Sequence, residues 1–113
     1  MSNTLSTLNV KHTPHHSREL NEGTQHIFLY DNGFGASVVK HQFSYGGSND
    51  LWELAVLQYD GVGNKDEYHS WPITYNTPIT DDVEGNLRDQ DVQRLLTRIK
   101  RLKPIGPDAL PRP

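Results

Sequence analysis

Cysteine is absent from this chain of 113 residues. Its absence excludes disulfides, thiolate nucleophiles and thiolate metal ligands, and it fits a reducing compartment. Long apolar runs are absent as well, since no stretch approaches the ~18 consecutive residues of a membrane span. The residues after Met1 also lack the charged and apolar regions of a signal peptide. We therefore expect a cytoplasmic protein with no membrane contact.

Motifs that would identify a reaction are also missing. The segment DNGFGASV carries two glycines, but it lacks the third glycine and the following helix of a dinucleotide-binding loop. No serine has the glycine-flanked turn of a hydrolase nucleophile. We expect no enzymatic activity and no cofactor. The formal net charge of −3 selects no partner by itself.

The polar residues gather toward the two ends of the chain. Apolar residues make up 34% of the sequence, below the ~45–50% of typical globular domains. Residues 1–22 are mostly polar and are expected to form a flexible arm. The last residues, KPIGPDALPRP, carry four prolines and predict an irregular tail at residues 104–113. A single domain is expected over residues 23–103.

Four segments have the alternation, or the β-branched and aromatic content, of strands. They are Gln25–Tyr30, Gly35–Tyr45, Leu51–Tyr59 and Glu67–Tyr75. The third is apolar on both faces, which is typical of a central strand. Pro72 interrupts the fourth, which suits an edge strand or a bulge. Because turn residues separate the first two, we expect an antiparallel meander of about four strands.

The spacing of apolar residues changes after Arg88. Val92, Leu95, Leu96, Ile99 and Leu102 recur at intervals of three and four, which predicts an amphipathic helix over Arg88–Lys103. Acids near its start and bases near its end complement the helix dipole. We expect Leu95, Leu96 and Ile99 to pack on Trp52, Leu54 and Val56. The fold class predicted from the sequence is therefore α+β.

Three acids, Asp81, Asp82 and Glu84, lie within the segment NTPITDDVEGNL. Thr80 precedes them, so its hydroxyl can cap a short helix over Thr80–Asn86 whose first turn favours acids. A metal or carbohydrate site and an acidic patch that faces a partner are the two alternatives. Adjacent acids on a helix diverge by about 100°, which disfavours convergence on one ion. Capping is the favoured interpretation.

The six histidines raise a metal hypothesis. His12, His15 and His16 are close in sequence, but no cysteine or nearby acid completes a tetrahedral set. A metal- or ligand-binding domain that uses His41, His69, Asp81 and Asp82 is kept as an alternative. Solvated or cross-strand histidines are favoured, and no metal is expected.

Several segments resemble a group of small uncharacterised bacteriophage proteins. The segments are NGFGASVV, LWELAVL and TPITDDV, followed by an amphipathic last helix, and the similarity covers about Tyr30 to Leu102. Such proteins share the variant NGYGASVV. The resemblance implies a phage origin and a location in the cytoplasm of the infected cell, and it implies no activity.

A binding function is expected from these features. The leading hypothesis is a non-enzymatic phage accessory protein that binds a macromolecular partner, such as a host enzyme or a defence component. The candidate partner-binding residues are Phe34, Tyr45, Tyr59, Trp71, Asp81, Asp82, Arg94, Arg98 and Arg101. Nucleic acid, bound along the basic side of the last helix, is a less expected partner, because no aromatic residues are interleaved with the arginines.

Self-association is a further expectation. One helix covers only one face of a sheet, so Leu51, Ala55, Leu57 and Tyr59 on the other face need shielding. The polar arm and an open face that awaits a host protein are alternatives. A symmetric dimer through this face is favoured.

Overall fold

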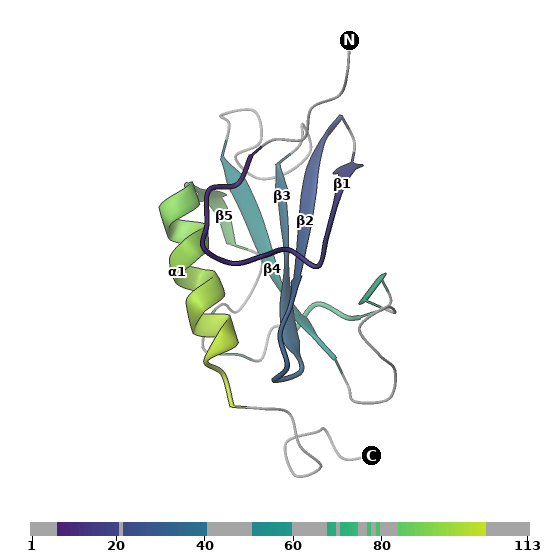
Figure 1. Ribbon diagram of the computed structural model, residues 1–113, viewed down its shortest axis with the longest axis vertical. Helices are drawn as coiled ribbons and strands as arrows, with labels where there is room; N and C mark the ends of the chain where they lie inside the picture. The colour runs from purple at the N-terminus through teal and green to yellow at the C-terminus, as the bar shows by residue number, and fades with distance from the viewer. Residues whose placement is uncertain are drawn as a thin grey trace.

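The computed structural model describes residues 7–20, 22–40, 51–59, 68–69, 71–74, 77, 79 and 84–103. These residues form β1 (His16–Leu20), β2 (Gly23–Leu29), β3 (Phe34–Lys40), β4 (Trp52–Gln58), β5 (Glu84–Leu87) and α1 (Asp89–Lys100). Each strand pairs antiparallel with the next, in the order β1-β2-β3-β4-β5. Helix α1 lies along one face of this sheet (Figure 1). The predicted α+β fold is confirmed, with five strands in place of about four.

The main core lies between α1 and the sheet. Its buried side chains are Phe28, Ala36, Val38, Trp52, Leu54, Val56, Ile79, Val92, Leu96 and Ile99. Strands β3 and β4 contribute every second residue and the helix contributes residues three or four apart, which are the repeats of the two element types. The predicted docking of Leu96 and Ile99 on this face is confirmed. Leu95 lies at the edge of the core and is half-buried.

The turn between β2 and β3 is joined to the end of α1 through Asn32. Its side-chain oxygen accepts the N–H of Phe34 at 3.0 Å. Its amide nitrogen donates to the carbonyls of Ile99 at 2.8 Å, Lys100 at 3.2 Å and Leu102 at 3.1 Å. Asn32 is buried, so one side chain provides partners for carbonyls that the end of a helix leaves unpaired.

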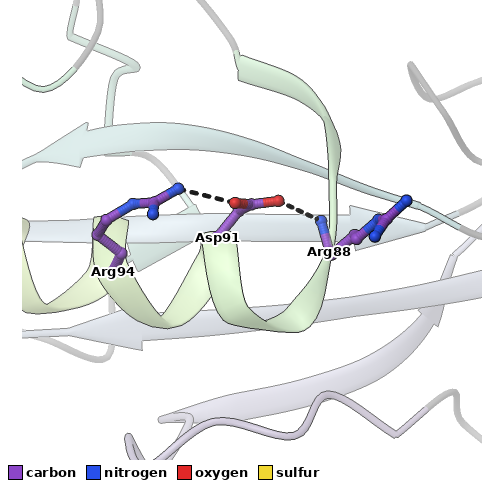
Figure 2. A network of polar contacts seen from close by, with 3 residues as sticks. All are labelled: Arg88, Asp91 and Arg94. Atoms are coloured by element: carbon purple, nitrogen blue, oxygen red, sulfur yellow. Dashed lines mark hydrogen bonds and ion pairs between the residues drawn. The ribbon is translucent and has the colours of Figure 1, made fainter.

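The N-terminus of α1 is stabilised by Asp91. Its carboxylate accepts the backbone N–H of Arg88 at 3.0 Å and the guanidinium of Arg94 at 2.7 Å (Figure 2). The first of these bonds reaches back from the third helical residue to the capping residue, which is half of a capping box. The helix begins at Asp89, one residue later than predicted, and it ends at Lys100 instead of Lys103.

The prediction of a short helix over Thr80–Asn86 is wrong for its last three residues. Glu84–Leu87 forms β5, which pairs with β4 through Leu87 and Trp52. Asn86 has a φ of 57°, the left-handed conformation expected of a helix stop, but it lies next to an irregular register in the sheet. Pairing with a central strand outweighs the local preference of the acids for a helix start. Residues 80–83 lie outside the described residues.

The fourth strand predicted over Glu67–Tyr75 is also wrong in its described part. Tyr68 and His69 form a short 3-10 turn, and Ile73 makes an isolated bridge to Leu57. Two further backbone bonds, Gln58 N–H to Pro72 at 3.0 Å and Thr74 N–H to Val56 at 2.8 Å, hold this segment at the edge of β4. Proline has no N–H to extend such a ladder.

The flexible arm predicted at residues 1–22 is replaced, over much of its length, by ordered structure. His16–Leu20 forms β1, and residues 7–13, here called the strap, run beside α1 (Figure 1). Leu8 and Val10 of the strap pack against the main core. The arm therefore contributes an edge strand and part of the core. Residues 1–6 and 104–113 lie outside the described part of the chain.

The second face of the sheet is covered by this chain itself. Ile27, Leu57 and Trp71 form a second buried cluster, with Leu29, Tyr59 and Tyr68 packed around it. Ala55 is only 7% exposed and Leu57 only 6%. Leu57 is therefore shielded by the segment that contains Trp71, in place of the second subunit that the sequence favoured.

Candidate functional site

A hollow on the second face of the sheet combines aromatic, apolar and polar side chains. It has a volume of about 240 Å3. Its lining comprises Arg18, Gln25, Ile27, Ser37, Leu57, Tyr68, His69, Trp71 and Ile73. The first five come from β1 to β4 and form the floor, and the last four come from the segment at the edge of β4 and form the wall.

The floor residues share one face because of strand alternation and register. Arg18 is paired directly with Gln25 across β1 and β2, and Ser37 is paired with Ile27 across β2 and β3. Residues two apart in a strand project to the same side, so these residues face away from α1. The polar side of the floor thus spans three strands.

The aromatic wall of the hollow is held by ring contacts. The rings of Tyr59 and Trp71 stack with centroids 4.9 Å apart and an interplanar angle of 26°. Tyr68 contacts His15, His16 and His69, with ring centroids 5.5, 5.8 and 6.0 Å apart. Offset stacking of this kind adds about 0.5–1.5 kcal/mol beyond the area that is buried. The wall is therefore fixed against β1 as well as against β4.

The polar floor is a chain of two hydrogen bonds. Gln25 donates from its side-chain amide to the hydroxyl oxygen of Ser37 at 2.9 Å, and its carbonyl oxygen accepts from Arg18 Nε at 2.6 Å. This chain holds the guanidinium at the hollow. Among the described residues, nothing bonds to the two terminal nitrogens of Arg18. Two nitrogens of the planar guanidinium, with four N–H donors, are therefore available there.

A second unused donor belongs to Trp71. This side chain is 8% exposed, and its buried Nε1–H has no hydrogen-bond partner among the described residues. A buried donor without a partner costs about 1–3 kcal/mol. The hollow is also bordered by an exposed apolar side chain: Ile73, 42% exposed, is the one large hydrophobic residue of the described part that is exposed. Apolar surface and unused donors thus occur together.

The structure brings two of the nine predicted partner-binding residues together, Tyr59 and Trp71. Phe34 instead packs half-buried against the main core. Tyr45, Asp81 and Asp82 lie outside the described residues.

The three predicted arginines lie elsewhere, on α1. Arg94, Arg98 and Arg101 are exposed, on the side of the helix opposite Val92, Leu96 and Ile99. Arg94 is paired with Asp91. The arginines and the aromatic hollow are therefore on opposite faces of the sheet.

The described histidines are held by neighbouring side chains. His12 contacts Tyr30 and Thr97, and His26 lies 2.6 Å from the hydroxyl of Ser17 with its ring against Trp52. No group of three or more acids or histidines among the described residues is placed to hold a metal ion. His41 lies outside these residues, so the combination of His41 with His69, Asp81 and Asp82 stays an untested alternative.

The sequence did not identify Arg18, Gln25 and Ser37 as candidate binding residues. Arg18 was assigned to the flexible arm, so its pairing with Gln25 had no basis. The one local signal was the turn-type segment Asn21-Glu22-Gly23, because residues 16–20 show no alternation of polar and apolar side chains.

Comparisons with protein-family models, with curated proteins and with solved structures found no match for the chain. No helix among the described residues is long and apolar enough to cross a membrane. Function is therefore inferred from the chemistry of the hollow.

Proposed function

We propose that the protein is a small non-enzymatic accessory protein that binds a macromolecular partner through the hollow at Tyr59, Tyr68 and Trp71. The phage origin implied by its segments makes a protein of the infected cell the expected partner. The observation that carries the proposal is the combination at one place of stacked aromatic rings, exposed Ile73 and unused donors. Binding hot spots are enriched in tryptophan, tyrosine and arginine, set in packed and desolvated surroundings.

The size of the hollow supports a macromolecular partner over a free small ligand. Sites for small molecules usually measure about 300–1,000 Å3 and enclose most of their ligand. A hollow of about 240 Å3 is smaller and accommodates a side chain presented by a larger molecule. A partner surface around the rim would exclude water from that contact.

Capture from a lysate of host cells tests the proposal. Tagged full-length protein, Ile73→Glu and Arg101→Glu are compared by quantitative mass spectrometry after confirmation of equal folding by circular dichroism. Ile73 is exposed, so its replacement leaves the core intact while it places a charge at the rim. We expect Ile73→Glu to lose a protein that the wild type and Arg101→Glu both retain.

The basic side of α1 supports nucleic-acid binding as a second candidate. Arg94, Arg98 and Arg101 are exposed on one side, and the backbone of exposed Lys11 in the strap bonds to Gln93 of the same helix, at 2.6 Å. Phosphate contacts give an affinity that falls steeply with salt. A duplex that binds wild type but not Arg101→Glu at low salt would favour this candidate, whereas loss with Ile73→Glu alone favours the hollow.

A further inference from the structure

The charge of the hollow limits what kind of group fits it. Arg18 gives the described lining one fixed positive charge, and no aspartate or glutamate is among the described lining residues. The whole chain, by contrast, carries a formal net charge of −3. A cation with no acid beside it among the described lining residues is complementary to an anionic group from outside.

The donors of the hollow have the geometry that a carboxylate requires. Gln25 occupies Nε of Arg18, so the guanidinium is held in place while its two terminal nitrogens stay available. Such a fork binds the two oxygens of a carboxylate with parallel hydrogen bonds, and these are about twice as strong as neutral ones. Because the side chain of Arg18 is already held by its neighbour, less rotational freedom is lost on binding.

Apolar and aromatic side chains also line the hollow. Leu57, Trp71 and Ile73 are among them, and the buried ring of Trp71 is backed by Tyr59. A group that fills both parts has an apolar body and a carboxylate.

We propose that the hollow recognises a carboxylate attached to an apolar body, presented by a peptide segment of the protein partner. Arg18 pairs with the carboxylate, and Leu57, Trp71 and Ile73 contact the apolar body. The proposal rests on the proposed function, since it names the chemistry that the same hollow selects. It assigns a binding role to Arg18, which the function proposed above does not require.

Two matched probes test this assignment on the full-length chain. Phenylacetate carries an aromatic body and a carboxylate, and phenylacetamide has nearly the same shape without the charge. Each is titrated into isotope-labelled protein, and the backbone amide signals of Gln25, Ser37 and Leu57 are followed by NMR. We expect saturable shifts with phenylacetate and about tenfold weaker binding of phenylacetamide, as the loss of one charge-assisted pair predicts.

Arg18→Gln and Arg101→Gln complete the test. Both remove one exposed positive charge, but only the first removes it from the hollow. Arg18→Gln should abolish the preference for phenylacetate, and Arg101→Gln should keep it. Equal binding of the two probes, unchanged by Arg18→Gln, would overturn the carboxylate assignment and leave the hollow as an apolar binding site, so the proposed function would stand. Binding of neither probe, or shifts that never saturate, would also overturn the assignment, and the capture experiment then decides the proposed function separately.

Discussion

Asn32 shows how much one buried amide contributes to this fold. It connects the β2–β3 turn to three carbonyls at the end of α1. The amide nitrogen is the donor in all three contacts. An aspartate has the same shape, but it would place a negative charge where the helix dipole is already negative.

Asn32→Asp should therefore lower the free energy of unfolding by about 1–3 kcal/mol, the usual cost of a lost buried hydrogen bond. The measurement is urea unfolding at pH 7. Gln90→Glu is the matched control, because it makes the same chemical change at an exposed position in the first turn of α1. Equal stability of Asn32→Asp and wild type would show that the contact of Asn32 with the helix end is energetically unimportant.

His12 should make the stability of the protein depend on pH. Its Nε2 lies 3.2 Å from the hydroxyl of Thr97, and its Nδ1 lies 2.9 Å from the hydroxyl of Tyr30. The Thr97 hydroxyl donates to the carbonyl of Gln93, so its oxygen accepts from Nε2–H, and Nδ1 of the neutral ring accepts from Tyr30. Burial, and secondarily the charge of Lys100, lowers the pKa of His12 below the usual 6.5.

Because the pKa of His12 is lower in the folded state, the unfolded state binds more protons in the window below pH 6.5. The contribution of neutral His12 to stability is therefore complete above that pH and falls as the pH drops toward the lowered pKa. Thermal melts between pH 8 and 5 should show a smaller loss of Tm in His12→Asn than in wild type. His69→Asn, which changes an exposed histidine, should behave as wild type; equal pH dependence of all three proteins would contradict this role of His12.

At the scale of elements, the strap and α1 have matching repeats. The N–H of Asn9 bonds to Asp89 at 3.2 Å, the N–H of Lys11 bonds to Gln93 at 2.6 Å, and His12 reaches Thr97. Asp89, Gln93 and Thr97 are four residues apart, so they lie in one row along the helix. The strap follows this row with a bend, where the N–H of Val10 bonds to the carbonyl of Leu8 at 3.1 Å, and Leu8 and Val10 pack against the core.

Val10→Asp should detach the strap and leave the sheet intact. Exposing a half-buried valine site and introducing a charge costs about 1 kcal/mol or more. Hydrogen exchange should quicken at the amides of Asn9 and Lys11 and stay slow at those of Val38 and Leu54. Thr13→Asp, at an exposed position, is the control. Unchanged exchange at Asn9 would mean that the strap does not depend on Val10.

The docking of α1 depends on its buried row. Leu96 is fully buried and its neighbour Leu95 is half-buried. Substitutions at the two positions therefore compare the cost of a fully buried and a half-buried leucine on one helix. Leu96→Ala should lower the free energy of unfolding by about 2–5 kcal/mol, and Leu95→Ala should cost clearly less. Similar losses in the two variants, measured by thermal and urea unfolding, would contradict the observed orientation of the helix.

At the scale of the whole molecule, the sheet is covered on both faces by one chain. Helix α1 and the strap cover one face, and the segment with Trp71 covers much of the other. The reason for expecting a dimer through Leu57 is thereby removed. The protein should sediment with a mass near 12.9 kDa at micromolar concentration.

Leu57→Glu should lower Tm without a change in mass, because Leu57 is buried within the second cluster of its own chain. A mass twice that of the chain, returned to the single-chain value by Leu57→Glu, would restore the dimer.

The sequence by itself determined the features that depend on neighbouring residues. The three- and four-residue spacing of Val92, Leu96 and Ile99 located α1 and its buried face. Asp31-Asn32-Gly33 located the β2–β3 turn, where Gly33 has the left-handed φ of 88° that glycine adopts without strain. The apolar residues on both faces of Leu51–Tyr59 identified the interior strand β4. Such features are local, because side-chain direction along an element follows from its own repeat.

Only the tertiary structure decided the features that depend on distant partners. Glu84–Leu87 forms a strand because it pairs with β4, although Glu84 and the acids before it favour a helix start. Arg18, Gln25 and Ser37 meet on the hollow floor only through the register of three strands. The strap lies beside α1 because Asp89, Gln93 and Thr97 of the helix accept its hydrogen bonds. These contacts join residues up to about eighty positions apart, and no pattern within one segment encodes them.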